Sequence, residues 1–126
     1  MNIILGKSFN DEIPLFLQIK ERVEEQILQG ILKEEDQIPS TTQIVSHYKI
    51  NHITVSKGIN ILVDMGIIYK KRGLGMFVAK GAREKILEER VDNFVKDFIE
   101  PLVQEAKNLN IKKEQVIKNI EETFKK

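Results

Sequence analysis

The chain of 126 residues contains no cysteine and no tryptophan, and aromatic residues of all kinds make up only 6% of it. The absence of cysteine excludes a disulfide framework, a thiolate zinc finger and a thiol nucleophile. The longest apolar runs are about four residues, whereas a membrane span needs roughly twenty. The first ten residues have neither a basic start nor a long apolar stretch, so no secretory signal is expected. We therefore expect a cytoplasmic protein that does not enter a membrane.

Charge is balanced over the whole chain but unevenly distributed along it. Charged residues make up 31% and hydrophobic residues 41%, which is typical of a folding, soluble chain, and the net charge is +1. Residues 37–81 carry six basic residues and one acidic residue, Asp64, whereas residues 1–36 are net acidic and residues 82–126 are neutral. A basic segment of this kind attracts a phosphate backbone, although six charges can equally form a solvated surface.

The first strong helical pattern follows Pro14. Apolar residues recur every four positions from Leu15 to Ile27, which predicts a helix over residues 14–29. Proline suits the first turn of a helix, where its missing N–H is not needed, and Gly30 suits the left-handed residue that follows a helix.

Two further helices are predicted from their capping residues. Ser40 with Gln43 three positions later is typical of a capping box and predicts a short helix over residues 41–47. Asn51 is a favourable N-cap for a third helix over residues 52–65. Two helices joined by about four residues form the helix-turn-helix pattern.

A basic hairpin is expected directly after these helices. Residues 67–71 and 76–79 favour short strands, and the glycine-containing residues 72–75 favour the turn between them. A helix-turn-helix followed by such a hairpin is a winged helix. The expected fold is therefore mainly α with a small β-hairpin, and residues 1–80 are predicted to be a winged helix-turn-helix DNA-binding domain.

Residues 80–82 are interpreted as a short linker to a helical tail, residues 81–126. Pro101 should kink or restart its long charged helix, and a polar break at residues 108–113 precedes a last short amphipathic helix. About forty-five residues are too few to build a domain with a ligand cavity. A second copy of the chain is the simplest cover for the apolar faces, although the tail could instead fold back on the first domain. The residues expected at a dimer contact are Leu87, Val91, Phe94, Phe98, Leu102, Leu109, Val116 and Ile120.

An ordered set of short motifs resembles the GntR family of transcription regulators. No single motif is specific, but together they cover about residues 14–79 in the family's order and spacing. The matching segments are residues 14–19 (P-[LI]-[YF]-x-Q-I in the family), 30–32 (G-x-L), 37–40 (L-P-S), 54–55 (T-V), 65–68 (x-G-[LI]-I) and 72–78 (the R-x-G-x-G-[TS]-[FY]-V wing, here one residue tighter).

Within this family, the chain resembles the YtrA-type subfamily most closely. Residues 51–57 are similar to its N-P-N-T-V-x-K, and residues 105–111 and 114–117 are similar to its E-A-[KR]-x-L-G-[IL]-x-x-E-[EQ]-[LV]-[IL] ending. The resemblance implies a homodimer held by a two-helix tail without an effector-binding domain. It further implies a sequence-specific transcriptional regulator, commonly a repressor and often of transporter operons, that binds double-stranded DNA at a palindromic operator.

The chain departs from the family pattern at several positions. Thr42, His52 and Ser56 stand where the family usually has arginine, which is the commonest reader of guanine. Gly58 replaces the usual alanine, and Glu35 replaces the usual turn glycine. The operator sequence therefore does not follow from the family.

The predicted DNA interface combines the recognition helix, the start of the helix before it and the wing. Asn51 could read adenine or only cap its helix, and Arg72 could enter a minor groove or only occupy a hairpin turn. Lys57 is expected to contact phosphate. Thr54 could donate to phosphate or only be a threonine on the helix surface, and Ile53 could touch a thymine methyl. Periodicity predicts that Asn51, His52, Ile53, Thr54 and Lys57 are exposed. The residues expected at the interface are Ser40, Thr41, Thr42, Gln43, Asn51, His52, Ile53, Thr54, Ser56, Lys57, Lys71, Arg72, Gly73 and Gly75, with Lys70 also in the wing.

Other functions are less well supported by the sequence. His47 and His52 have no third ligand at metal spacing, and no nucleophile elbow, P-loop or dinucleotide motif is present, so neither catalysis nor a cofactor is expected. The alternative function is a winged-helix module that docks an acidic protein partner. An RNA-binding role is disfavoured because Tyr48 and Tyr69 look isolated, without an aromatic stacking platform. The sequence does not indicate a small-molecule effector.

Overall fold

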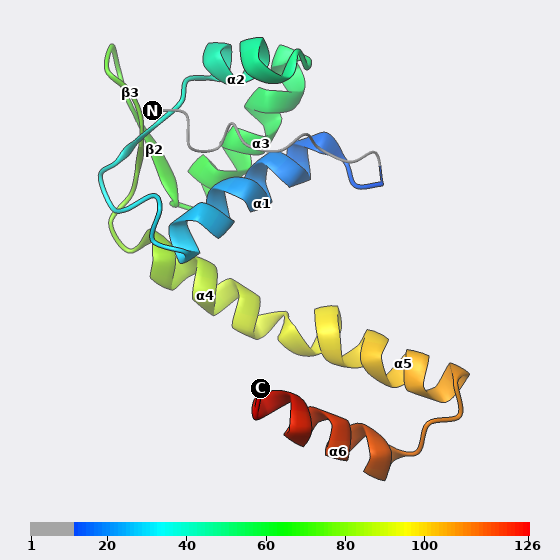
Figure 1. The fold of residues 1–126 in the computed structure, drawn as a ribbon. Coiled ribbons are helices and arrows are strands. Elements are labelled where there is room, and N and C mark those ends of the chain that lie inside the picture. The colour runs from blue at the N-terminus through cyan, green and yellow to red at the C-terminus, as the bar shows by residue number, and fades with distance from the viewer. Residues whose placement is uncertain (1–11) are drawn as a thin grey trace. The chain divides into compact units, whose positions relative to one another are not determined.

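The computed structural model describes residues 12–126, which form two compact units divided after Glu88 (Figure 1). The first unit contains a small antiparallel sheet and the helices expected of a winged helix. Its elements are α1 (Leu15–Leu28), β1 (Gln37–Ile38), α2 (Thr41–Tyr48), α3 (His52–Asp64), β2 (Ile68–Lys71), β3 (Gly75–Val78) and the start of α4 (Ala82–Asp92). The expected bounds of the first three helices agree with these to within one residue.

The sheet has one strand more than the predicted hairpin. Its strand order is β1–β3–β2 with both pairs antiparallel, and β1 joins through the pairs Gln37↔Phe77 and Ile38↔Met76. The predicted hairpin itself is confirmed, with Ile68 opposite Val78 and Lys71 opposite Gly75. A strand of two residues is too short to show alternation, so its pairing with a distant strand had no local signal.

One apolar core holds the first unit together. Each helix contributes the face that its apolar spacing predicts, and alternate strand residues complete the core from the sheet. Its buried members are Ile19, Val23, Ile27, Leu32, Ile38, Ile44, Val55, Ile59, Leu62, Ile67, Ile68, Met76, Val78, Ala82 and Ile86. The helix-turn-helix is therefore fixed on α1 and on the sheet, which sets where its exposed side chains point.

The helix starts are capped as expected. Ser40 and Gln43 form a complete capping box, in which the Gln43 N–H donates to Ser40 Oγ and the Ser40 N–H donates to Gln43 Oε1. The Asn51 Oδ1 accepts a hydrogen bond of 2.6 Å from the backbone N–H of Ile53. Each cap satisfies a backbone donor that the first helical turn leaves without an intrahelical partner.

The start of α4 belongs to the first unit rather than to a linker. Ala82, expected in a linker over residues 80–82, opens α4 and is fully buried, as is Ile86 one turn later. Lys85 Nζ donates to the carbonyl of Gly66 just beyond α3, and Glu34 accepts from the backbone N–H of Gly81. The compact first unit consequently continues to Glu88, beyond the boundary expected after residue 80.

The second unit is built from helical segments. After α4 come a π-helical turn, Val95–Ile99, then α5 (Glu100–Asn108) and α6 (Lys113–Phe124). Pro101 lies in the first turn of α5, so the long helix changes from a π-helical turn to an α-helix where a kink or restart was predicted, and the π-helical turn itself was not foreseen. The helices α5 and α6 run in roughly opposite directions, joined across the predicted polar break (Figure 1). In residues 12–126 no helix combines the length and apolar character of a membrane span.

Candidate nucleic-acid interface

Three segments of the first unit carry the residues predicted to contact DNA. They are the start of α2, the first turns of α3 and the turn of the β2–β3 hairpin. In Figure 1 all three segments lie at the same upper end of the first unit. The helix α3 packs against both α2 and β2, and Lys70 on β2 donates a hydrogen bond of 3.1 Å to Asn60 in the middle of α3.

The start of α2 offers backbone donors rather than side-chain charge. The side chains of Ser40 and Gln43 serve the capping box, while Thr42 is exposed and Thr41 is half-buried. A helix N-terminus attracts an anion through its remaining N–H groups and its dipole. This segment is therefore suited to hold a phosphate group.

The first turn of α3 exposes one apolar and two polar side chains. Ile53 is 75% exposed, so its apolar side chain does not contribute to the core. Asn51 uses its Oδ1 in the cap, and its Nδ2 has no hydrogen-bond partner in the described part of the chain. His52 Nδ1 lies 3.5 Å from Ser56 Oγ, at the outer limit of a hydrogen bond.

Further along α3, Lys57 and Thr54 differ in their surroundings. The Nζ of Lys57, an exposed residue, lies 4.1 Å from the centroid of the Phe16 ring on α1. Thr54 was expected to be exposed but is half-buried. Asn60, one turn beyond Lys57 on the same exposed face, was missed, although its helical spacing from Lys57 could have indicated it.

The wing presents Arg72 at its turn. Arg72 is exposed and has no hydrogen bond or ion pair with any residue from 12 to 126. Gly73 and Gly75 take φ values of +79° and +123°, as their place in a tight turn requires. The Gln37 side chain on β1 braces the turn by donating to the carbonyl of Leu74 over 2.9 Å.

The two lysines of β2 point to opposite sides of the sheet. Lys70 reaches Asn60 on α3, whereas the Nζ of Lys71 lies 5.9 Å and 5.3 Å from the ring centroids of Tyr69 and Phe77. This separation follows from the two-residue alternation of a strand. The structure thus brings Lys70, rather than Lys71, to the side of the recognition helix.

Tyr69 is not isolated, contrary to expectation. Its ring stacks on its cross-strand neighbour Phe77 with centroids 5.8 Å apart, and its hydroxyl donates to the carboxylate of Glu35. The hydrogen bond to Glu35, with smaller effects of burial and of that negative charge, raises the pKa of Tyr69 above its ordinary value. Glu35 itself has a φ of +70°, a left-handed conformation that explains why glycine would suit this turn.

The basic residues of the segment 37–81 are not paired with acidic side chains in the described part of the chain. None of the six makes an ion pair with a carboxylate among residues 12–126. The same part of the chain contains no cluster of three histidine, aspartate or glutamate side chains that could hold a metal ion. The ring of His47 instead packs edge-on against Tyr48.

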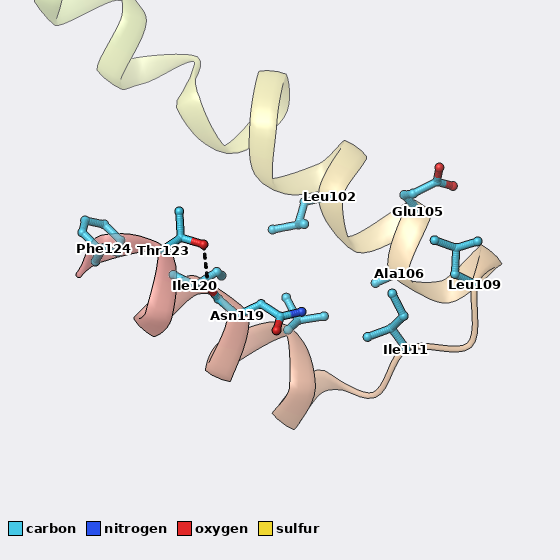
Figure 2. Close-up of a pocket in the computed structure, with 10 residues that line it drawn as sticks. Leu102, Glu105, Ala106, Leu109, Ile111, Asn119, Ile120, Thr123 and Phe124 are labelled. Carbon is cyan, nitrogen blue, oxygen red and sulfur yellow. Dashed lines mark hydrogen bonds between the residues drawn. The ribbon is translucent and has the colours of Figure 1, made fainter. Parts of the chain in front are cut away.

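The tail exposes the apolar residues that were expected at a dimer contact. Leu87, Val91, Phe94, Phe98, Leu102, Leu109 and Ile120 are exposed, and Val116 is half-buried. An apolar groove of about 330 Å³ lies between α5 and α6, lined by side chains that include Leu102, Ala106, Val116 and Ile120 (Figure 2). A second apolar hollow of about 540 Å³ shares several of these residues. One copy of the tail therefore leaves much of its apolar surface in contact with water.

Comparison with known proteins places this arrangement among bacterial regulators. Residues 15–78 match the family described as "Bacterial regulatory proteins, gntR family". The chain is 26% identical over 116 residues to the uncharacterized HTH-type transcriptional regulator YhcF of Bacillus subtilis, covering 92% of this chain and 94% of that protein. It is 28% identical over 109 residues to the transcriptional repressor YtrA of the same organism, covering 86% and 83%. The resemblance seen in the sequence is confirmed by these matches.

Solved structures agree with the sequence comparison. A putative transcriptional regulator of the GntR family from Bacteroides thetaiotaomicron is 32% identical, with a TM-score of 0.68, over 88% of this chain and 96% of that one. The DNA-binding domain of AraR in complex with an operator is 28% identical, with a TM-score of 0.52, over 59% of this chain and 89% of that domain. The AraR domain is matched over a smaller share of this chain than the regulator from Bacteroides thetaiotaomicron.

Proposed function

Because the chain belongs to the gntR family of bacterial regulatory proteins, we propose that this DNA-binding transcriptional regulator works as a homodimeric repressor on a roughly palindromic operator. The observation that carries the proposal is that the six basic residues of the segment 37–81, which contains the recognition helix and the wing, form no ion pair with a carboxylate among residues 12–126. Such a surface binds a phosphate backbone with release of counterions. The family consists of regulators rather than enzymes, and no cofactor or effector is part of the proposal.

In the proposed complex, the first turns of α3 enter the major groove. Ile53 would contact a thymine methyl, and the free Nδ2 of Asn51 would donate to a base acceptor. His52 and Ser56, which lie at usual arginine positions, would not supply the bidentate guanidinium of arginine. The operator is therefore expected to depend less on bidentate guanine contacts than operators read by arginine.

Phosphate and minor-groove contacts would fix the protein on the duplex. The start of α2 would bind one phosphate through its backbone N–H groups, and Lys57 and Lys70 would approach phosphates beside α3. Arg72 at the wing turn would enter a minor groove, where a narrow A·T tract strengthens the negative potential. Lys71 lies on the other side of the sheet and would contribute only to the general attraction.

The dimer would form through the tail. A second copy of the chain would cover the exposed apolar residues of α5, α6 and the preceding π-helical turn. The length shared with YhcF and YtrA supports a tail of this kind, and the similarity to YtrA, a transcriptional repressor, supports repression. Two-fold symmetry would place two recognition helices in successive major grooves about 34 Å apart, which requires a roughly palindromic operator.

Selection of binding sites from random duplex DNA tests the proposal directly. The selected duplex should compete at least a thousandfold better than random DNA, and binding should weaken steeply with salt. The selected sites should show two inverted half-sites about one helical turn apart. Binding without sequence preference, or without salt dependence, would contradict the proposal. Binding to an acidic protein but to no duplex would instead favour the protein-interaction module.

A further inference from the structure

A contact between α1 and α3 links an aromatic ring to a basic residue of the recognition helix. Phe16 lies in the first turn of α1, and the Nζ of Lys57 lies 4.1 Å from the centroid of its ring. A cation within about 6 Å of an aromatic centroid is attracted by the negative face of the ring. The ammonium group of Lys57 is therefore held at a defined place on the exposed side of α3.

The close approach of the two helices fixes the position of this contact. A Cβ at position 58 would lie 2.6 Å from the backbone oxygen of Phe16, so α1 and α3 meet almost backbone to backbone at Gly58. Ile19, whose Cβ would lie 3.2 Å from that added Cβ, and Ile59 next to Gly58 are both buried in the core. Since Lys57 immediately precedes Gly58, its side chain leaves α3 directly beside the ring of Phe16.

We propose that Phe16 is a positioning residue for DNA binding, whose ring holds the Lys57 ammonium ready to contact a phosphate. The inference rests on the proposed function, in which Lys57 approaches the backbone of the duplex. A free lysine side chain loses rotamer entropy when it is fixed against a phosphate, and prior ordering on the ring reduces this loss. The ring uses no hydrogen bond of the ammonium group, so all three N–H donors stay available for phosphate oxygens.

A double-mutant cycle with Phe16→Leu and Lys57→Met tests the coupling. Binding to the selected operator duplex is measured by fluorescence anisotropy for the wild-type protein, the two single variants and the double variant. Loss of a cation–π contact at an exposed site corresponds to about a two- to fivefold weakening, which is the expected effect of Phe16→Leu. Lys57→Met should weaken binding and reduce the salt slope by about one. In the Lys57→Met background, Phe16→Leu should cause no further loss.

Phe16→Tyr is the matched control, because it keeps an aromatic ring at the same place. It should retain wild-type affinity and the wild-type salt slope. Proton NMR provides a direct readout of the geometry, since a ring above the side chain shifts the Lys57 ε-methylene signals upfield. The upfield shift should persist in Phe16→Tyr and disappear in Phe16→Leu. Phe16→Met replaces Phe16→Leu in all measurements if the leucine variant does not fold.

The possible negative results distinguish an error in this inference from an error in the proposed function. If Phe16→Leu weakens binding equally in the wild-type and in the Lys57→Met background, the ring acts through the fold and the inference is wrong. Unchanged affinity in folded Phe16→Leu, or unshifted Lys57 signals in the wild-type protein, would also overturn it. In each of these cases the proposed function stands, because the wild-type protein still binds the duplex. A wild-type protein that binds no duplex would overturn the proposed function, and this inference with it.

Discussion

Replacing Gly58 by alanine tests the close crossing of α1 and α3. Helix propensity alone predicts that Gly58→Ala raises the free energy of unfolding by about 1 kcal/mol, because glycine is unfavourable in a helix interior. The added methyl group, however, would lie 2.6 Å from the backbone oxygen of Phe16 and 3.2 Å from Cβ of Ile19. Overpacking of a core costs about 1–3 kcal/mol, and a backbone oxygen cannot rotate away. Because this contact is with the backbone, we expect a cost in the upper part of that range, about 2–3 kcal/mol, and therefore a net loss of about 1–2 kcal/mol, opposite in sign to the effect of propensity.

The assay is urea unfolding followed by circular dichroism at one fixed protein concentration, since the stability of a dimer depends on concentration. Asn60→Ala is the matched control, because Asn60 is exposed on the same helix and its replacement should change stability by less than about 0.5 kcal/mol. A Gly58→Ala protein as stable as wild type, or more stable, would refute the reasoning. The helices would then have to separate at little cost, and the contact between Lys57 and Phe16 would not be fixed by their crossing.

Four other changes test separate parts of the structure. Leu62→Ala truncates a fully buried core residue and should lower the free energy of unfolding by about 2–5 kcal/mol in the same urea assay. Arg72→Ala should weaken operator binding and reduce the salt slope by about one while leaving the urea midpoint unchanged, and full affinity would remove Arg72 from the interface. Because the pKa of Tyr69 is raised in the folded protein, its hydrogen bond to Glu35 should stabilise the fold fully below the ordinary tyrosine pKa of about 10 and lose this effect as pH rises through the raised value. A Tyr69→Phe protein whose stability followed the same alkaline profile as wild type would contradict this assignment. Phe98→Asp should convert the proposed dimer to a monomer in sedimentation experiments at micromolar concentration, and a dimer that persists in this variant would exclude this part of the tail from the contact.

Local sequence signals predicted the helices of the first unit well. Apolar spacing located α1, and the capping residues Ser40 and Asn51 located the starts of α2 and α3. These signals involve residues within about one turn of each other, so no knowledge of the tertiary structure was needed. The turn glycines of the hairpin belong to the same class, because the required φ is a property of the residue itself.

The features that were missed depend on contacts between distant parts of the chain. The strand β1 exists only because Gln37 and Ile38 pair with β3. The stacking of Tyr69 on Phe77 depends on the register of the hairpin. Linear spacing alone does not specify such pairings.

The candidate site was predicted in outline but not in its detailed contacts. The sequence placed Lys57 on the recognition helix but could not show that it meets Phe16, because that contact depends on how two helices cross. Lys70 and Lys71 are adjacent in the sequence, yet strand alternation sends them to opposite sides of the sheet.

The burial of Ala82 and Ile86 determines how the protein can be divided for study. A fragment ending at residue 80 would remove two core side chains and the lysine that bonds to the carbonyl beyond the recognition helix. Its hydrophobic interior would open to water at the end of α3, and loss of DNA affinity in such a fragment would report on unfolding. A piece that ends at Glu88 keeps this interior closed, so a separate DNA-binding unit should be prepared with the first two turns of α4 attached.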